Sequence, residues 1–77
     1  MKQFDVFNGT SEDATVIGRV VAMDEVEAIS TLQAYRNGFR VTEPGDGVPN
    51  AYVEWANPDL GNVHPESVRY WRARESQ

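Results

Sequence analysis

The chain has 77 residues, of which 40% are hydrophobic and 25% are charged. This is the composition of a folded domain rather than of a disordered segment. A chain of this length has room for one hydrophobic core, so we expect a single domain over residues 1–77. The absence of cysteine excludes disulfide bonds and thiolate zinc sites.

The formal charge of −5 is unevenly distributed along the chain. Residues 1–66 carry eleven acidic and four basic side chains, whereas residues 67–77 carry one acidic side chain and three arginines. The acidic body would repel phosphate groups, which disfavours direct nucleic-acid binding, and it would attract a basic surface on a partner protein. Asp5 interrupts the apolar run that a signal peptide needs, and no stretch approaches the roughly 20 apolar residues of a membrane span. We therefore expect a cytoplasmic protein without a membrane partner.

Two strands are expected before the first helix. Residues 3–7 alternate Phe4 and Val6 with Asp5, the turn-forming residues 8–13 reverse the chain, and residues 14–23 are rich in β-branched side chains, as central strands are. Gly18 within this second run indicates either a β-bulge or a close approach of another backbone, of which the bulge is the commoner.

The best-defined local signal is a helix over residues 24–38. Asp24 can cap its start, with Glu27 three residues later completing a capping box. Apolar residues then recur at three- and four-residue spacing, and Asn37-Gly38 provides the left-handed end. The residues of the expected apolar face are Ala28, Ile29, Leu32 and Tyr35.

The second half of the chain predicts two further strands and one ambiguous segment. Residues 39–43 and 51–56 have strand composition, and loops rich in proline and glycine follow each of them. Over residues 65–74, Pro65 and the spacing of Val68 and Trp71 favour a helix. The alternation of Val68 and Tyr70 with Arg69 and Trp71, together with the aromatic content, favours a strand, which we prefer. The expected fold class is α+β: an antiparallel sheet of order ββαββ plus a C-terminal element, with one amphipathic helix on one face.

Catalytic chemistry has little support in the sequence. His64 is the only histidine, and no serine near it lies in a nucleophile elbow, so we interpret His64 as a loop residue that caps the segment beginning at Pro65. The loops around Asp46 and Asp59 lack the spacing of a calcium site, and there is no phosphate-binding glycine motif. We expect a non-enzymatic protein with no catalytic residue, cofactor or metal.

Recognition chemistry is concentrated near the C-terminus. Arginine with aromatic residues can stack on bases and grip phosphate, and the same residue types dominate protein interfaces. We expect the partner-binding residues to be Tyr70, Trp71, Arg72 and Arg69, and we expect Trp55 to belong to the core. The alternative is that Trp55 and Trp71 both belong to the core and that the arginines are only solvated. The acidic residues Glu12, Asp13, Glu25 and Glu27 are further candidates, because they can meet a protein surface that normally contacts nucleic acid.

One segment resembles a known kind of domain. Residues 19–38 (RVVAMDEVEAISTLQAYRNG) are similar to the strand-then-helix core of DpnD/PcfM-like domains of phage and mobile-element proteins, in which a strand ending in alanine precedes an acidic helix start and Glu-Ala. In size, acidity and lack of catalytic residues, the chain also resembles phage-encoded anti-CRISPR and anti-restriction inhibitors. These resemblances imply a phage-type protein of the host-cell cytoplasm.

Three functions follow as hypotheses. The first is an inhibitor or adaptor that binds a host protein, for example one that handles nucleic acid. The second is a nucleic-acid-binding module that uses the C-terminal arginines and aromatics, although the net charge opposes it. The third is a homo-oligomeric assembly protein, such as a homodimer, because so small a sheet leaves an edge strand free to pair; the segment around Tyr52, Val53 and Trp55 is the expected edge.

Overall fold

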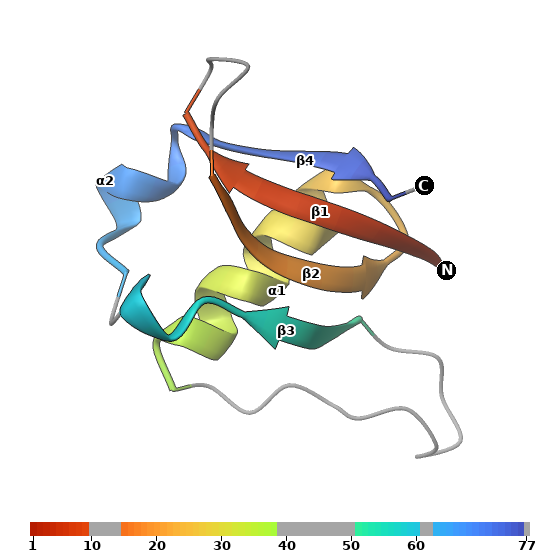
Figure 1. Cartoon of the computed structure of the whole chain (residues 1–77), viewed down its shortest axis with the longest axis horizontal. Coiled ribbons are helices and arrows are strands. Elements are labelled where there is room, and N and C mark those ends of the chain that lie inside the picture. The colour runs from red at the N-terminus through yellow and green to blue at the C-terminus, as the bar shows by residue number, and fades with distance from the viewer. Residues whose placement is uncertain (10–14, 39–50, 61–62, 77) are drawn as a thin grey trace.

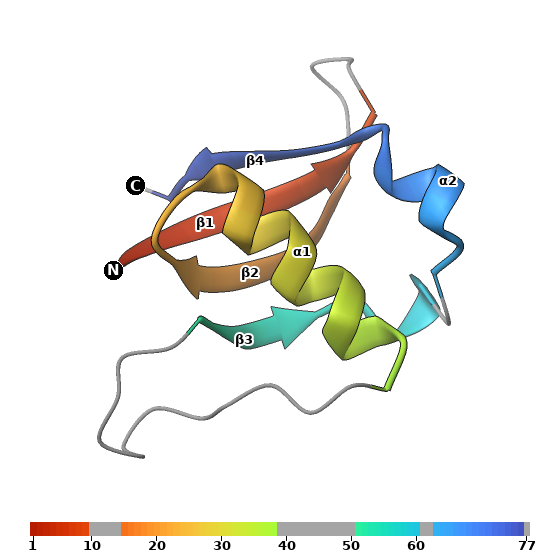
Figure 2. The same cartoon turned by 180° about the vertical axis from the view of Figure 1, so that it is seen from behind.

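A computed structural model describes residues 1–9, 15–38, 51–60 and 63–76, and these form a four-stranded antiparallel sheet with a helix packed on one face (Figures 1 and 2). The predicted α+β fold class is thereby confirmed. The strand order is β3-β2-β1-β4. The elements in chain order are β1 (Lys2–Asn8), β2 (Val16–Ala22), α1 (Glu25–Arg36), β3 (Tyr52–Ala56), the 3-10 turn η1 (Pro58–Leu60), α2 (Pro65–Val68) and β4 (Trp71–Glu75).

The two N-terminal strands pair as predicted, with Phe4 opposite Val20 and Val6 opposite Gly18. Because side chains alternate between the two faces of a strand, these pairs direct Phe4, Val6 and Val20 to the same side, and all three are buried. The pairing skips Ile17, so β2 carries a bulge next to Gly18. Both interpretations of Gly18 apply, because a β-carbon there would lie 2.8 Å from Leu32 Cδ1 and 3.1 Å from the carbonyl oxygen of Trp55. A side chain at this position would have to displace Leu32 of α1 and would press on the backbone of β3.

Helix α1 begins and ends where the sequence predicts. The Glu27 N–H donates to Asp24 Oδ1 and the Met23 N–H donates to Glu27 Oε1, both at 2.8 Å, so the capping box forms. Asn37 is the C-cap, and Gly38 follows with a φ of 86°. Ala28 and Leu32 are fully buried and Ile29 packs beside them, whereas Tyr35 remains 47% exposed. The apolar face of the helix is therefore one turn shorter than expected.

The C-terminal segment contains both of the structures that its sequence allowed. Residues 65–68 form α2, a single turn in which the Glu66 N–H donates to His64 Nδ1 at 3.3 Å, and the chain then enters β4. The expected capping role of His64 is confirmed. Because a strand begins at residue 71, β4 can pair with the backbone N–H and C=O groups on the edge of β1 that faces away from β2. A continued helix could not form these hydrogen bonds.

Of the two tryptophans, Trp71 is in the core and Trp55 is at the surface, which is the reverse of the prediction. Trp71 is only 5% exposed and belongs to the core cluster with Phe4 and Leu32, whereas Trp55 is 48% exposed. Trp71 is directed inward because β4 begins at this residue, opposite Asn8, and its alternation turns Ala73 to the same side. The expected exposure of Trp71 and burial of Trp55 are therefore wrong.

Three of the expected segments cannot be compared with the structure in full. The strand expected over residues 39–43 and the loop after it lie outside the described residues, as does most of the turn over 8–13. The helix C-terminus is anchored to the chain that follows β3, since the Val63 N–H donates to Asn37 Oδ1 at 2.7 Å. In the described part of the chain, no helix has the length and apolarity that crossing a membrane requires.

Candidate functional site: the open face of the sheet

The sheet has one face covered by α1 and one face that no described helix covers, which we call the open face (Figure 1). Alternation along each strand sends every second side chain to it. The open face carries three arginines, three aromatic rings and two carboxylates: Arg19, Arg72, Arg74, Phe7, Tyr52, Trp55, Asp5 and Glu54. These residues come from all four strands.

One row of cross-strand neighbours runs across the open face. Arg74 of β4 lies opposite Asp5 of β1, Asp5 lies opposite Arg19 of β2, and Arg19 lies opposite Trp55 of β3. Directly opposed side chains in antiparallel strands approach to about 5 Å, which is close enough for contact. The row therefore joins two arginines, one carboxylate and one indole into a continuous surface.

Asp5 is the electrostatic centre of this row. Arg19 Nε and Ser76 Oγ both donate hydrogen bonds to Asp5 Oδ1, at 2.9 and 2.8 Å. Partial burial of Asp5 favours its neutral form, but the hydrogen bonds from Arg19 and Ser76 and the charges of Arg19 and Arg74 outweigh the burial. The pKa of Asp5 consequently lies below its ordinary value of 3.8.

The lowered pKa of Asp5 predicts a pH-dependent stability. Because the folded pKa is depressed, the stabilisation is complete above the unfolded pKa and is lost as the pH falls through the folded pKa. Asp5→Asn should therefore lower the free energy of unfolding by about 1 kcal/mol at neutral pH, the upper end for an exposed ion pair. Urea unfolding of both proteins at neutral pH and near pH 3 measures this difference. A difference of the same size at both pH values would contradict the assignment.

A second contact on the open face joins β4 to an aromatic ring of β1. The guanidinium carbon of Arg74 lies 5.6 Å from the centroid of the Phe7 ring, within the range of a cation–π interaction. Phe7 also lies opposite Arg72, so two arginines flank one ring. This arrangement holds Arg74 in place while its charge remains at the surface, because Arg74 is exposed.

The far side of the open face is provided by β3. Trp55 is exposed and Tyr52, which lies opposite Val21, is half-buried. The strand pairing skips Glu54, so β3 is bulged there, and the Glu54 carboxylate accepts a hydrogen bond from the Gln3 side-chain amide. The bulge allows two neighbouring residues, Glu54 and Trp55, to be exposed together.

The expected partner-binding residues are only partly brought together. Arg72 lies on the open face, Arg69 and Tyr70 lie exposed in the turn before β4, and Trp71 is buried in the core. Glu25 and Glu27 lie in the first turn of α1, on the covered side of the sheet, where Glu27 is engaged in the capping box. Glu12 and Asp13 lie outside the described residues. The two acidic pairs therefore cannot be assigned to one surface.

Sequence reasoning missed Arg19 and Phe7 as members of the arginine-aromatic surface. The alternation within each strand is the signal that could have found them. It already predicts that Asp5 and Phe7 lie on the opposite face of β1 from Phe4 and Val6. The missing information was the register between strands, because Asp5 and Ser76 are separated by 71 positions and still form a hydrogen bond. Nothing in a local pattern of residues specifies such a pair.

The chemistry available on the open face is that of binding. Guanidinium groups form hydrogen bonds with carboxylates or phosphates, and the rings supply apolar contact area. Among the described residues, no three histidine, aspartate or glutamate side chains converge as a metal site would require. His64 is used as a helix cap at the end of the molecule that contains α2.

Comparison with known proteins gives no match to any family, to any curated protein or to any solved structure. The similarity of residues 19–38 to DpnD/PcfM-like domains and the likeness to phage inhibitors therefore stay predictions.

Proposed function

We propose that this chain is a non-enzymatic binding protein, an adaptor or inhibitor, and that it binds a partner protein through the open face of its sheet. The observation that supports this most directly is the row Arg74, Asp5, Arg19 and Trp55, extended by Phe7 and Arg72. Arginine, tryptophan and tyrosine are the residue types that provide most of the energy of protein interfaces.

The partner surface should be acidic where it meets β4. Arg19 is neutralised by Asp5 in an ion pair of 2.9 Å, whereas Arg72 and Arg74 have no ion pair with any described residue. Their positive charge is therefore available to a partner's carboxylates, which would also be steered away from the acidic side that carries α1. Trp55, at the opposite edge, would provide the apolar anchor.

The open face also suits a preformed interface. Arg19 and Arg74 are each held by a neighbour on the sheet, so little side-chain entropy remains to be lost on binding. A side chain that is already ordered in the free protein contributes more of its contact energy to the net affinity. This is the physical reason for preferring the sheet face over the isolated residues Arg69 and Tyr70.

The experiment that tests this function is affinity capture from the native host with three versions of the chain as bait. The unmodified chain should retain a specific partner, and the double variant Trp55→Ala/Arg74→Ala should lose it. Tyr35→Ala on α1 is the matched control, since it also removes an exposed ring and should retain the partner. Equal recovery by the double variant, checked to be folded by circular dichroism, would contradict the proposal.

A second candidate function is single-stranded nucleic-acid binding, which the arginines and aromatic rings of the open face favour. Aromatic rings and arginines on a sheet surface are the arrangement on which bases stack in single-strand binders. Asp5 and Glu54 on the same face and the net charge of −5 oppose it. A gel-shift series at low salt with DNA and RNA single strands tests this function. If the chain binds neither nucleic acid at low salt, the function is excluded.

A further inference from the structure

The outer edge of β4 has backbone groups that no described strand pairs with. Within the described residues β4 is the last strand of the sheet and has β1 on one side only. The Ser76 N–H donates to the Gln3 carbonyl at 2.8 Å and the Gly9 N–H donates to the Tyr70 carbonyl at 3.0 Å. Since hydrogen-bonded pairs alternate in an antiparallel ladder, Arg72 and Arg74 direct their backbone groups toward β1. The N–H and C=O groups of Trp71, Ala73 and Glu75 therefore point away from the sheet.

A groove runs beside this edge. One hollow of about 390 Å³ lies between the first turn of α1 and the end of β4, and another of about 410 Å³ lies between α1 and the start of β4. Glu25 and Val26 line both hollows, so the two adjoin at the first turn of α1. We call this the β4 groove. Its floor includes Phe4, Trp71 and Ala73, and its wall on α1 includes Val26, which is 74% exposed.

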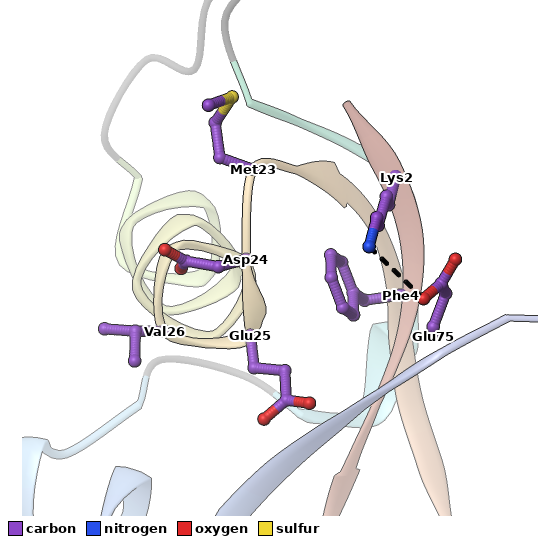
Figure 3. A pocket seen from close by; sticks show the side chains of 7 residues that line it. All are labelled: Lys2, Phe4, Met23, Asp24, Glu25, Val26 and Glu75. Carbon is purple, nitrogen blue, oxygen red and sulfur yellow. Dashed lines mark ion pairs between the residues drawn. The ribbon is translucent and has the colours of Figure 1, made fainter.

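The two ends of the β4 groove carry opposite charge. The hollow near the end of β4 contains Asp24, Glu25 and Glu75, with Lys2 as its one cation and paired to Glu75 at 3.7 Å (Figure 3). In Figure 3, Glu25 points from the helix toward β4, and Phe4 points from the sheet toward the helix. The hollow near the start of β4 contains Arg69 and Arg72 instead. An occupant must match this change of sign along the strand.

We propose that the β4 groove binds an extended segment of a partner protein, which adds a fifth strand to the sheet antiparallel to β4. Residues of an added strand share a face with the residues they oppose. The segment residue opposite Ala73 therefore enters the groove and is apolar, and those opposite Arg72 and Arg74 are acidic. The residue opposite Glu75 is basic, because it meets Glu25 (Figure 3), and the residue opposite Trp71 is acidic, because it meets Arg69. From its N-terminus the segment reads basic, acidic, apolar, acidic, acidic.

The charges also disfavour the other strand that could pair here, a second copy of this chain. Antiparallel pairing of two β4 strands about Ala73 would place Arg72 of one chain opposite Arg74 of the other, twice in the dimer. Directly opposed like charges destabilise a strand pair. The same two arginines thus oppose self-association and select acidic residues in a partner. The inference shares Arg72 and Arg74 with the open face, but it places the segment at the outer edge of β4 and does not depend on Trp55.

The test uses the full chain and two labelled peptides blocked at both ends, followed by fluorescence anisotropy at low ionic strength. The first peptide is Lys-Glu-Val-Glu-Asp, and the second, Glu-Lys-Val-Lys-Lys, has its charges exchanged. We expect the first to bind roughly tenfold more tightly, from several exposed ion pairs in sum. The net charge of −5 alone favours the second peptide, so this order of affinities cannot come from non-specific attraction.

Two modifications test the strand pairing and the register. Methylation of the valine amide nitrogen in the first peptide should weaken binding roughly tenfold, because it removes the main-chain donor that faces Ala73. Glu25→Lys should weaken binding of the first peptide about threefold and restore it for a peptide with glutamate at the first position. Glu66→Lys is the matched control, since Glu66 is exposed on α2, lines neither hollow and changes the net charge equally.

The outcomes separate this inference from the proposed function. Trp55→Ala should leave peptide binding unchanged, because Trp55 lies on β3 at the other edge of the sheet. Loss of peptide binding in that variant, equal affinity for both peptides, or tolerance of the N-methyl group would overturn the inference while leaving binding at the open face untouched. A dimer paired through β4, or displacement of the peptide by a single-stranded oligonucleotide, would overturn it in favour of those occupants.

Discussion

Replacing Trp71 with alanine is expected to abolish folding. The Trp71 side chain is 5% exposed and packs in the core cluster beneath α1. Removing a buried tryptophan costs about 3–5 kcal/mol, from lost burial and from the cavity that remains. A core of this size provides only about 3–5 kcal/mol in total. Far-UV circular dichroism and urea unfolding of Trp71→Ala measure the loss.

The adjacent residue gives the control for Trp71. Tyr70 is 58% exposed in the turn that precedes β4, so Tyr70→Ala should change the free energy of unfolding by about 0.5 kcal/mol or less. If Trp71→Ala unfolded cooperatively at the same urea concentration as the unmodified chain, Trp71 would not belong to the core.

Replacing Trp55 with alanine is expected to have the opposite effect to replacing Trp71: the fold is kept and partner binding is weakened. The variant should remain folded, because Trp55 is half-exposed and the described core does not include it. It should bind the partner protein more weakly by about 2 kcal/mol, which is roughly 30-fold in Kd, as for a hot-spot tryptophan. Isothermal titration with the captured partner measures the affinity, and the melting temperature measures the fold.

Tyr35→Ala is again the matched control for Trp55, because Tyr35 is exposed to a similar extent but lies on α1. It should leave both affinity and melting temperature close to those of the unmodified chain. If Trp55→Ala and Tyr35→Ala weakened the partner equally, binding would not be located on the open face.

The helix could be predicted from sequence because its determinants are local. Asp24 and Glu27 form the capping box within one turn, and Gly38 ends the helix one residue after the cap. The strands of the first hairpin were predictable for the same reason, since each shows its buried face in its own alternation. Such short-range signals give the element type and its approximate bounds.

The roles of the two tryptophans could not be predicted, because they depend on the start of a strand and on its register. In the run from Val68 to Arg72 the alternating residues can face either way until β4 begins at Trp71 and pairs with Asn8. For Trp55, the bulge at Glu54 shifts the phase of β3 so that the indole lies opposite Arg19. A one-residue difference in either strand would have exchanged core and surface.

The open face was missed as a site for a related reason. Its members are chemically ordinary residues within their own segments, and only the pairing of β4 with β1 brings Arg74 next to Phe7 and Asp5. Of the acidic candidates, Glu27 is explained by the capping box that it forms with Asp24 at the start of the helix. Composition indicated recognition chemistry without locating it.

The most direct test of binding at the open face uses the two tryptophans of the chain as reporters. Each indole N–H gives one signal in a proton–nitrogen NMR spectrum, and Trp55→Ala assigns them by loss of one signal. On addition of the captured partner, the Trp55 signal should shift or broaden as complex forms, and the buried Trp71 signal should keep its position. A shift confined to Trp71, or a saturated complex in which neither signal moves, would contradict binding through the open face.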